Sequence, residues 1–300
     1  MAALLSISKV DFAHENYEVL VIDNGPKTEA KVVVDAMNRS DRRIHYFREP
    51  VIGLHNARHR GAREAKGEIL VYVDDDVSVK AGWLRAIVAP FSDARVACAG
   101  GKVSPFWENC QPPQWWSNLP RDYLSLLDYG DERLELQWPQ CVNGCNMAVR
   151  RTVLFQVGGF HPDGYGDARL IWFRGDGETG LLKKIYSSGY RIVYEPAACL
   201  NHHISASRLT PGYFFWRAFI EGISDSYTGI RDSRSRTRIL LRAFYSYFHS
   251  AYHYCRARLK PRNKILALCD ASYWYGRGQH QLRAVLSHKL YRHVVQETYL

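Results

Sequence analysis

Short hydrophobic runs alternate with segments of helical spacing along the first two thirds of the chain. Strands are predicted over residues 17–23, 43–47, 68–73, 96–103 and 191–194, and helices over residues 28–38, 53–65 and 79–91. The strands are almost wholly apolar, which is typical of a mostly parallel sheet covered on both faces. Beyond residue 213 the pattern becomes all-helical. The sequence therefore predicts an α/β fold, with a sheet domain over residues 1–212 and a helical region over residues 213–300.

The net charge of +10 is concentrated in the helical region. Residues 231–300 contain 14 Lys and Arg but only 3 Asp and Glu, while the rest of the chain is close to neutral. The overall composition, 46% hydrophobic and 23% charged, is that of a globular protein and excludes disordered, collagen-like and coiled-coil chains. A near-neutral body with a basic, aromatic-rich tail indicates two separate tasks.

The basic region contains one segment with two distinct helical faces. One face carries Leu240, Phe244, Tyr247, Phe248, Ala251 and Cys255, and the opposite face carries Arg238, Arg242, His249, His253, Arg256 and Lys260. This separation suits a helix that lies on an anionic membrane surface. A slightly favoured alternative is a helix whose apolar face packs on the rest of the protein and whose basic face is solvated. Nucleic acid is a third possible partner, but the sequence contains no nucleic-acid-binding motif, so it is not expected.

Other features of the chain predict its compartment. No apolar run approaches the ~18 residues of a membrane span, and the first ten residues lack the basic start of a secretory signal. The seven cysteines include no CxxC pair and are predicted to be reduced, and the spacing of Cys141 and Cys145 is weak evidence for zinc. We expect a cytoplasmic protein, peripheral on the inner face of the cell membrane if the basic helix binds lipid.

Acidic residues follow two of the predicted buried strands. Asp74, Asp75 and Asp76 come directly after the strand over residues 68–73, and Asp23 ends the strand over residues 17–23. Side chains alternate along an extended segment, so Asp74 and Asp76 point to the same side. Two carboxylates on one side suit a hard divalent cation, with waters and phosphate oxygens completing its shell. The alternative is a solvated or helix-capping turn.

Several ordered motifs together resemble glycosyltransferase family 2. They are VIDNG, GLHNARHRGAREAKGEILVYVDDDV, GCNMAVRR, VGGF and GDGETGLLKKIYSSGYRIVYEP, and the similarity covers about residues 17–203. The resemblance implies the nucleotide-sugar-binding GT-A fold, here with a helical basic C-terminal region. It also implies an inverting, metal-dependent transfer of a sugar to a glycan or lipid-linked acceptor, in bacterial surface polysaccharide synthesis.

The resemblance also implies roles for individual residues. Donor contacts are implied for Asp23, Arg58, Asp74, Asp75, Gly144 and Asn146. Asp76, with Asp74 and His202, would hold Mg²⁺ or Mn²⁺, which stabilises the leaving nucleoside diphosphate. Asp176 would take the proton of the acceptor hydroxyl as catalytic base, carried on a glycine-rich loop. Glu178, two residues further on, is the alternative base.

The chain departs from the family pattern in two places. Gly175 precedes Asp176 where the family usually has a glutamate. Residues 2–11 match only the first helix of the family, and the strand that normally precedes this helix, central in the sheet, is not in the sequence. The resemblance therefore implies either a misplaced start codon or a truncated product. A truncated relative that binds donor without turnover, acting as a scaffold, is the alternative function.

Overall fold

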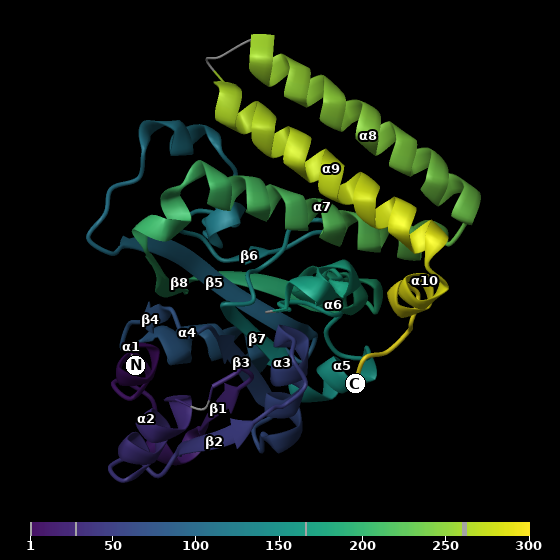
Figure 1. Cartoon of the computed structure of the whole chain (residues 1–300). Helices are drawn as coiled ribbons and strands as arrows, with labels where there is room; N and C mark the ends of the chain where they lie inside the picture. Colours follow the sequence, from purple (N-terminus) through teal and green to yellow (C-terminus); the bar gives the residue numbers. More distant parts are fainter. Residues whose placement is uncertain (1, 28, 166, 260–262) are drawn as a thin grey trace.

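The computed structural model describes residues 2–27, 29–165, 167–259 and 263–300 (Figure 1). Its strands are β1 (Val19–Asp23), β2 (Ile44–Arg48), β3 (Ile69–Val73), β4 (Val77–Val79), β5 (Val96–Trp107), β6 (Leu134–Glu135), β7 (Asn146–Arg150) and β8 (Arg191–Ile204). Its α-helices are α1 (Ala2–Ile7), α2 (Glu29–Asn38), α3 (Leu54–Glu64), α4 (Trp83–Val88), α5 (Arg151–Gln156), α6 (Gly177–Ser187), α7 (Pro211–Ser233), α8 (Arg236–Leu259), α9 (Lys264–Leu286) and α10 (His288–Val294). Six short 3-10 helices, η1 to η6, complete the described elements.

The main sheet is mixed, which corrects the expectation of a mostly parallel one. Its order is β3-β7-β5-β8-β4, with β6 pairing on β8. Strand β7 runs antiparallel to both neighbours, and only the β5–β8 pairing of this sheet is parallel. The pattern analysis did not predict β7 as a strand, so its direction could not enter the expectation. The antiparallel pairing sets Val73, the last residue of β3, opposite Asn146, the first residue of β7.

Strands β1 and β2 form a separate parallel sheet beside β3 (Figure 1). Among the described residues, β1 pairs only with β2 and β3 pairs only with β7, so each has one edge without a partner strand. A slot of about 490 Å³ lies between these edges, lined by both strands and by residues that include Ile7, Phe12 and Arg58. The slot therefore separates β1, which ends in Asp23, from β3, which Asp74 follows.

Helices cover both faces of the main sheet. On one face, Trp83 and Ile87 of α4 and Phe214 of α7 pack with Leu200 of β8. On the other face, Leu154 of α5 and Leu181 of α6 pack with Met147 and Tyr194. All of these side chains are almost completely buried, so the two apolar layers hold the sheet and fix the loops at its ends.

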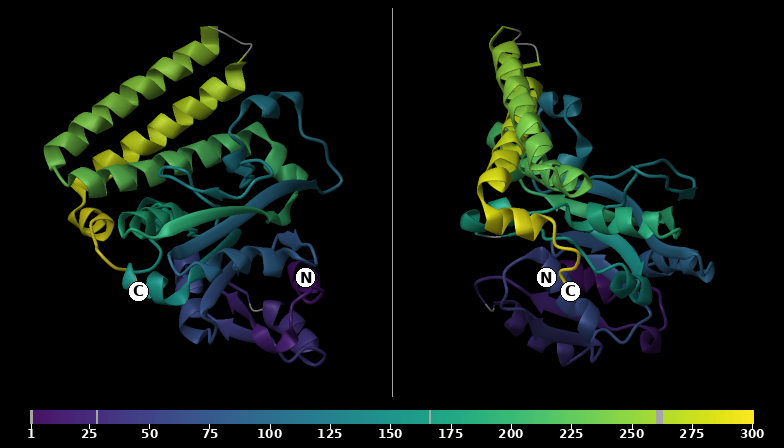
Figure 2. Two further views of the ribbon diagram at one scale, coloured as in Figure 1. Left: turned by 180° about the vertical axis from the view of Figure 1, so that it is seen from behind. Right: turned by 90° about the vertical axis from the view of Figure 1, so that its right-hand side faces the viewer.

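The helical region begins at Pro211, close to the expected boundary at residue 213. Helix α9 lies between α7 and α8, and the pair α8–α9 projects away from the sheet as a narrow layer (Figure 2). Glycines permit this close packing. A side chain at Gly222 of α7 would collide with the carbonyl of Tyr273, and one at Gly276 of α9 would collide with the carbonyl of Phe219. No described helix combines the length and the apolar character that crossing a membrane requires.

Helix α8 packs on α9 with its small residues and leaves its aromatic residues exposed. Ala243, Ser246 and Ala257 are buried in the contact, whereas Phe244 is 65% and Phe248 70% exposed. The basic face is turned partly inward: His253 Nδ1 lies 3.2 Å from Asp270 Oδ2 of α9, and the ring of His249 lies 4.7 Å from that of Trp274. The alternative is therefore wrong in its buried apolar face, whereas Arg238, Arg242 and Arg256 of the basic face are exposed, as it expected. Lys260 lies outside the described residues.

The open strand edges predict a specific pattern of amide hydrogen exchange. Amides on the free edges of β1 and β3 should exchange much faster than those of β5, which is hydrogen-bonded to strands on both sides. Exchange monitored by mass spectrometry on peptides covering residues 19–23, 69–73 and 96–103 tests this. Protection of β1 and β3 equal to that of β5 would show that another strand fills the slot in solution.

Candidate active site

Polar side chains from distant parts of the sequence converge at the carboxyl ends of β3 and β1. Asp74 and Asp76 lie in the turn between β3 and β4, and Arg58 projects from α3. Glu178 comes from the first turn of α6, and His202 from the last part of β8. Arg58, Asp76 and Glu178 lie close enough to Asp74 for their charges to shift its pKa, and His202 contacts Asp76. The structure thus brings together five of the residues expected from the sequence.

Arg58 is the centre of this cluster. Its side chain is only 6% exposed, and its Nη1 donates a hydrogen bond of 3.1 Å to Glu178 Oε2. The guanidinium group also stacks over the ring of Phe160, 5.1 Å from its centroid. A side chain at Gly144 would collide with this guanidinium, so the glycine leaves room for it. The backbone N–H of Gly144 donates to the other carboxylate oxygen, Glu178 Oε1, at 3.3 Å.

The buried cluster shifts the acidities of both carboxyl groups. Burial raises the pKa of Asp74 from 3.8 to about 6, against the opposing effect of Arg58, and the charges of Asp76 and Glu178 raise it further. Burial also acts to raise the pKa of Glu178, but the Arg58 charge and the hydrogen bonds outweigh it, so this pKa lies below its usual value. At neutral pH Glu178 is therefore ionised, and the neighbouring Asp74 loses its proton only at a higher pH than an ordinary aspartate.

Asp76 and His202 form the second polar centre. Asp76 Oδ2 lies 3.3 Å from His202 Nε2, and the guanidinium group of Arg208 contacts both atoms. His202 Nδ1 lies 2.8 Å from the carbonyl oxygen of Leu124, so it must carry the proton and donate it. The other ring nitrogen, Nε2, accepts from Arg208 Nη1, which can only donate, so it carries a lone pair beside Asp76. Two acceptors this close together require a cation between or beside them.

These residues fit a divalent metal ion. Asp76 Oδ1 is buried and has no hydrogen-bond partner among the described residues, which is the state of a carboxylate oxygen that awaits a ligand. The hydrogen bond from His202 Nδ1 to a carbonyl is the usual support for a metal-binding imidazole. The described residues contain no cluster of three or more His, Cys, Asp or Glu that could hold a metal. Asp76 and His202 would therefore share the ion with phosphate oxygens and water.

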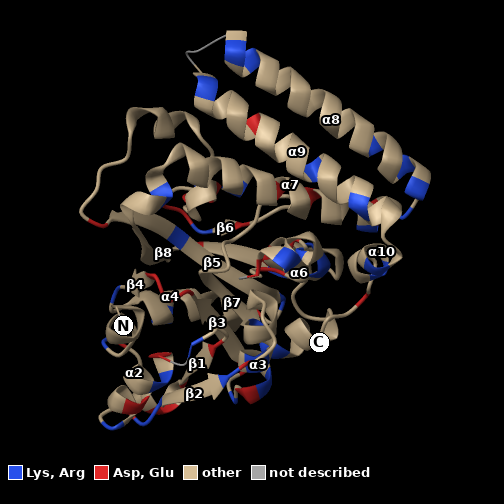
Figure 3. Cartoon of the chain, viewed as in Figure 1, with Lys and Arg blue, Asp and Glu red and all other residues tan. Residues whose placement is uncertain are grey.

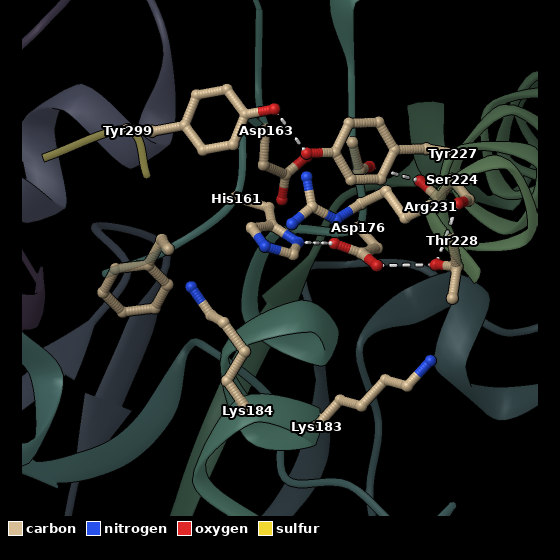
Figure 4. Close-up of polar contacts among 12 residues, drawn as sticks. His161, Asp163, Asp176, Lys183, Lys184, Ser224, Tyr227, Thr228, Arg231 and Tyr299 are labelled. Carbon is tan, nitrogen blue, oxygen red and sulfur yellow. Dashed lines mark hydrogen bonds and ion pairs between the residues drawn. The ribbon is translucent and has the colours of Figure 1, made fainter. Parts of the chain in front are cut away.

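Asp176 lies apart from this cluster, in a buried contact of its own (Figure 4). Its side chain is 6% exposed, and its two oxygens are held by His161 Nδ1 and Thr228 Oγ1, each at 2.5 Å. Thr228 belongs to α7, so the aspartate joins the loop before α6 to the helical region. Ser224 strengthens the same junction by donating to the carbonyl of Gly175 at 2.9 Å. The expectation of a mobile loop that carries Asp176 to an acceptor does not match these contacts.

Three further residues expected at the donor site have other surroundings. Asn146 is completely buried and all its polar atoms are paired, with Trp83 and with the carbonyls of Lys102 and Ala198. It is therefore a core residue and cannot contact a donor, which corrects that assignment. The carboxylate of Asp23 accepts from Tyr46, Arg48 and the N–H of Gly25 on the small sheet. Asp75 is exposed.

The sequence analysis missed Arg208, His161 and Thr228. Arg208 lies 132 positions from Asp76, and His161 and Thr228 lie 15 and 52 positions from Asp176. None of them belongs to a motif with fixed spacing, so only the folded chain reveals these contacts. The one available signal was the spacing of Arg208 six residues after His202, at the end of the same apolar strand.

Comparisons with known proteins relate this chain to one sequence family. The model of the family described as Glycosyl transferase family 2 matches residues 2–158, which include Arg58, Asp74 and Asp76 and end before Glu178. The glucosyl-dolichyl phosphate glucuronosyltransferase of Haloferax volcanii is 24% identical over 217 residues, covering 70% of this chain and 67% of that protein. The GalNAc(5)-diNAcBac-PP-undecaprenol beta-1,3-glucosyltransferase of Campylobacter jejuni is 22% identical over 270 residues, covering 89% of this chain and 81% of that protein. In three other relatives the match spans only 22% to 33% of their length.

The fold has counterparts among solved structures. The mannosyltransferase PcManGT from Pyrobaculum calidifontis, solved with GDP-Man and Mn²⁺, superposes with a TM-score of 0.52 at 18% sequence identity. The superposition covers 95% of this chain and 70% of that protein. At this identity the likeness concerns the fold, a central sheet flanked by helices.

The raised pKa of Asp74 predicts how its replacement changes stability with pH. In the folded protein Asp74 keeps its proton up to pH about 6, whereas the unfolded chain loses it near 3.8. Its charge therefore destabilises the fold above pH 6, and the penalty disappears below pH 4. Asp74→Asn should raise the free energy of unfolding at pH 7.5 by up to about 3 kcal/mol, since each pKa unit corresponds to about 1.4 kcal/mol. At pH 4 it should have little effect.

Urea unfolding at both pH values measures this difference. Asp75→Asn is the matched control, because it removes the charge of the exposed neighbouring carboxylate and should change stability little at either pH. An equal effect of Asp74→Asn at pH 4 and pH 7.5 would contradict the raised pKa.

Proposed function

The chain belongs to glycosyl transferase family 2, and we propose that it transfers a sugar from a nucleotide-sugar donor to a lipid-linked or glycan acceptor with inversion of the anomeric centre. The observation that carries this proposal is the convergence of Arg58, Asp74, Asp76 and Glu178 at one edge of the sheets. The carboxyl ends of such strands are where α/β sheets bind ligands. A buried cation beside several carboxylates suits a reaction in which a diphosphate leaves and a hydroxyl is deprotonated.

The donor diphosphate would bind next to Asp76 and His202. A divalent Mg²⁺ or Mn²⁺ held by these two residues would act as a Lewis acid and stabilise the charge on the leaving nucleoside diphosphate. Asp23 ends β1 at the same edge, but its carboxylate is only 5% exposed and already accepts from Tyr46, Arg48 and Gly25, so we assign it to holding this edge and not to a direct nucleoside contact. Asp74, which lies beside Arg58, would orient the ribose or a donor hydroxyl through hydrogen bonds.

We assign the catalytic base to Glu178 in preference to Asp176. Glu178 is 28% exposed, is ionised at neutral pH and lies beside Arg58 and Asp74, so an acceptor hydroxyl can reach it. Asp176 is almost completely buried and both its oxygens are occupied. The position of Glu178 in the first turn of α6 also favours its negative charge, because the helix N-terminus carries a partial positive charge.

The surface of helix α8 is evidence in favour of an acceptor that lies in a membrane. Its 24 residues contain five arginines and no acidic residue, and Figure 3 shows the basic residues near both ends of the helix. The exposed aromatic side chains of Phe244, Phe248 and Tyr252 lie between them along the outer side. Exposed aromatic residues flanked by arginines suit a surface of anionic lipid. The Haloferax and Campylobacter relatives are named for polyprenol-linked acceptors, and we place this chain in a similar step of surface glycan assembly.

Replacement of the two candidate bases separates their roles. Glu178→Gln keeps the size of the side chain and one of its two hydrogen-bond acceptors but removes the proton-accepting carboxylate, so kcat should fall by about 10²–10⁴-fold. The affinity for donor should change only a few-fold. Release of nucleoside diphosphate from UDP-GlcNAc and from GDP-mannose, with a polyprenyl-phosphate-linked acceptor in detergent, measures turnover.

Asp176→Asn is the comparison variant. Loss of the charge between His161 and Thr228 should lower the free energy of unfolding by about 1–3 kcal/mol, while the folded protein keeps most of its kcat. If Asp176→Asn is inactive with an unchanged melting temperature and Glu178→Gln is active, Asp176 is the base.

Sedimentation with vesicles tests the proposed membrane contact. The protein should co-sediment with phosphatidylglycerol vesicles, not with phosphatidylcholine vesicles, and high salt should release it. Each arginine near such a surface contributes about 1 kcal/mol, so replacing Arg238, Arg242 and Arg256 by Gln should lower the partition by about 100-fold.

Replacement of Arg85, Arg95 and Arg169 by Gln is the matched control, because these exposed arginines carry the same charge and lie outside α8. Phe244→Ser with Phe248→Ser should weaken binding without altering charge. Equal partition onto neutral and anionic vesicles would refute the electrostatic contact.

A further inference from the structure

Arg208 occupies the cation position of the Asp76–His202 centre. It lies in η6 (Ala206–Leu209), between β8 and α7. Its Nη2 donates to Asp76 Oδ2 at 2.6 Å, and its Nη1 donates to His202 Nε2 at 3.0 Å. One guanidinium group thus bridges the two acceptors that are suited to a metal ion.

The chemistry of His202 makes this occupancy exclusive. Its Nδ1 donates a proton to the Leu124 carbonyl, and its Nε2 accepts an N–H of Arg208, which can only donate, so Nε2 has one lone pair and no hydrogen. A single lone pair either accepts the N–H of Arg208 or coordinates a metal ion, and it cannot do both. A divalent ion bound to His202 must therefore displace Arg208.

We infer that Arg208 is an internal counter-ion that closes the empty metal site and couples metal binding to nucleotide binding. This inference rests on the proposed function, in which Asp76 and His202 hold a divalent ion. The Arg208 side chain is 33% exposed, so it can leave Asp76 and His202 without disturbing the core. The displaced guanidinium lies beside the ion, where phosphate oxygens of the donor would bind, and a guanidinium fork pairs well with phosphate.

The charge balance explains why the two ligands should bind together. Without ligands, the charge of Arg208 compensates that of Asp76. A divalent ion alone leaves Arg208 unpaired and adds uncompensated positive charge. The two phosphate groups of a nucleotide-sugar carry one negative charge each and restore neutrality, with Arg208 as their partner. Metal and diphosphate therefore strengthen each other's binding, and the coupling acts through Arg208.

Titration of Mn²⁺ with and without nucleoside diphosphate measures this coupling. The signal of free Mn²⁺ in electron paramagnetic resonance gives its affinity for the 300-residue protein, alone and with 1 mM UDP or GDP as probes. In the wild type, Mn²⁺ alone should bind weakly and the diphosphate should strengthen binding. In Arg208→Gln the competitor is gone, so Mn²⁺ alone should bind about tenfold more tightly or better, the typical strength of a charge-assisted hydrogen bond.

The enhancement by diphosphate should shrink by a similar factor in Arg208→Gln. Arg121→Gln is the matched control, because this exposed arginine belongs to the same segment as Leu124 and makes no described hydrogen bond or ion pair to Asp76 or His202. It should behave like the wild type in both titrations. Thermal unfolding of each variant shows that it is folded.

The outcomes separate the inference from the proposal beneath it. Equal Mn²⁺ affinity of wild type and Arg208→Gln in the absence of diphosphate overturns the role of Arg208 and leaves a metal-dependent enzyme. Absence of Mn²⁺ binding to every protein, with diphosphate present, overturns both the metal and the role of Arg208. Mn²⁺ binding by Arg208→Gln but not by the wild type, both without diphosphate, supports the inference in its strongest form, a site that Arg208 keeps closed.

Discussion

The buried guanidinium of Arg58 is the constraint that organises the site. A charge taken out of water costs several kcal/mol unless hydrogen bonds and opposite charges compensate it. Here Glu178 and the face of Phe160 compensate it, and Asp74 lies close by. Glu178 comes from α6, Phe160 from the loop after α5 and Asp74 from the end of β3. The charge of one residue of α3 therefore fixes how three segments meet. Gly144 follows from the same constraint, since any larger residue would push the guanidinium away from its partners.

The two polar centres share a mode of construction. In each, one arginine neutralises a carboxylate that it contacts, Glu178 for the buried Arg58 and Asp76 for the partly exposed Arg208. Arg58 is enclosed, and its partners are fixed by packing. Arg208 is partly exposed and comes from a short segment between β8 and α7. The first cation therefore belongs to the permanent structure, whereas the second can be exchanged for ligands.

Sequence reasoning recovered features that depend on neighbouring residues. Strands β1 and β3 were predicted from their nearly continuous apolar runs and helix α3 from its helical spacing, and Asp74 and Asp76 were singled out because they follow such a strand. It failed where distant contacts decide. The direction of β7 depends on the strands that it pairs with, and Asn146 is a core residue only because Trp83 and two carbonyls surround it. Asp176 and Glu178 differ because one contacts His161 and helix α7, whereas the other contacts Arg58. The outward aromatic face of α8 follows from its contact with α9, which buries Ala243, Ser246 and Ala257 and which the apolar pattern of α8 does not reveal.

The slot between β1 and β3 also has a mechanical consequence. Asp23 and the Asp74–Asp76 turn belong to two sheets that share no backbone hydrogen bonds among the described residues. A nucleotide that reached from one sheet to the other would act as a strut between them. Part of its binding energy would then be spent on holding the two sheets in register. Such a nucleotide can be compared with a fragment that contacts only one sheet. The difference between their affinities would then depend on the stiffness of the protein as well as on the number of contacts.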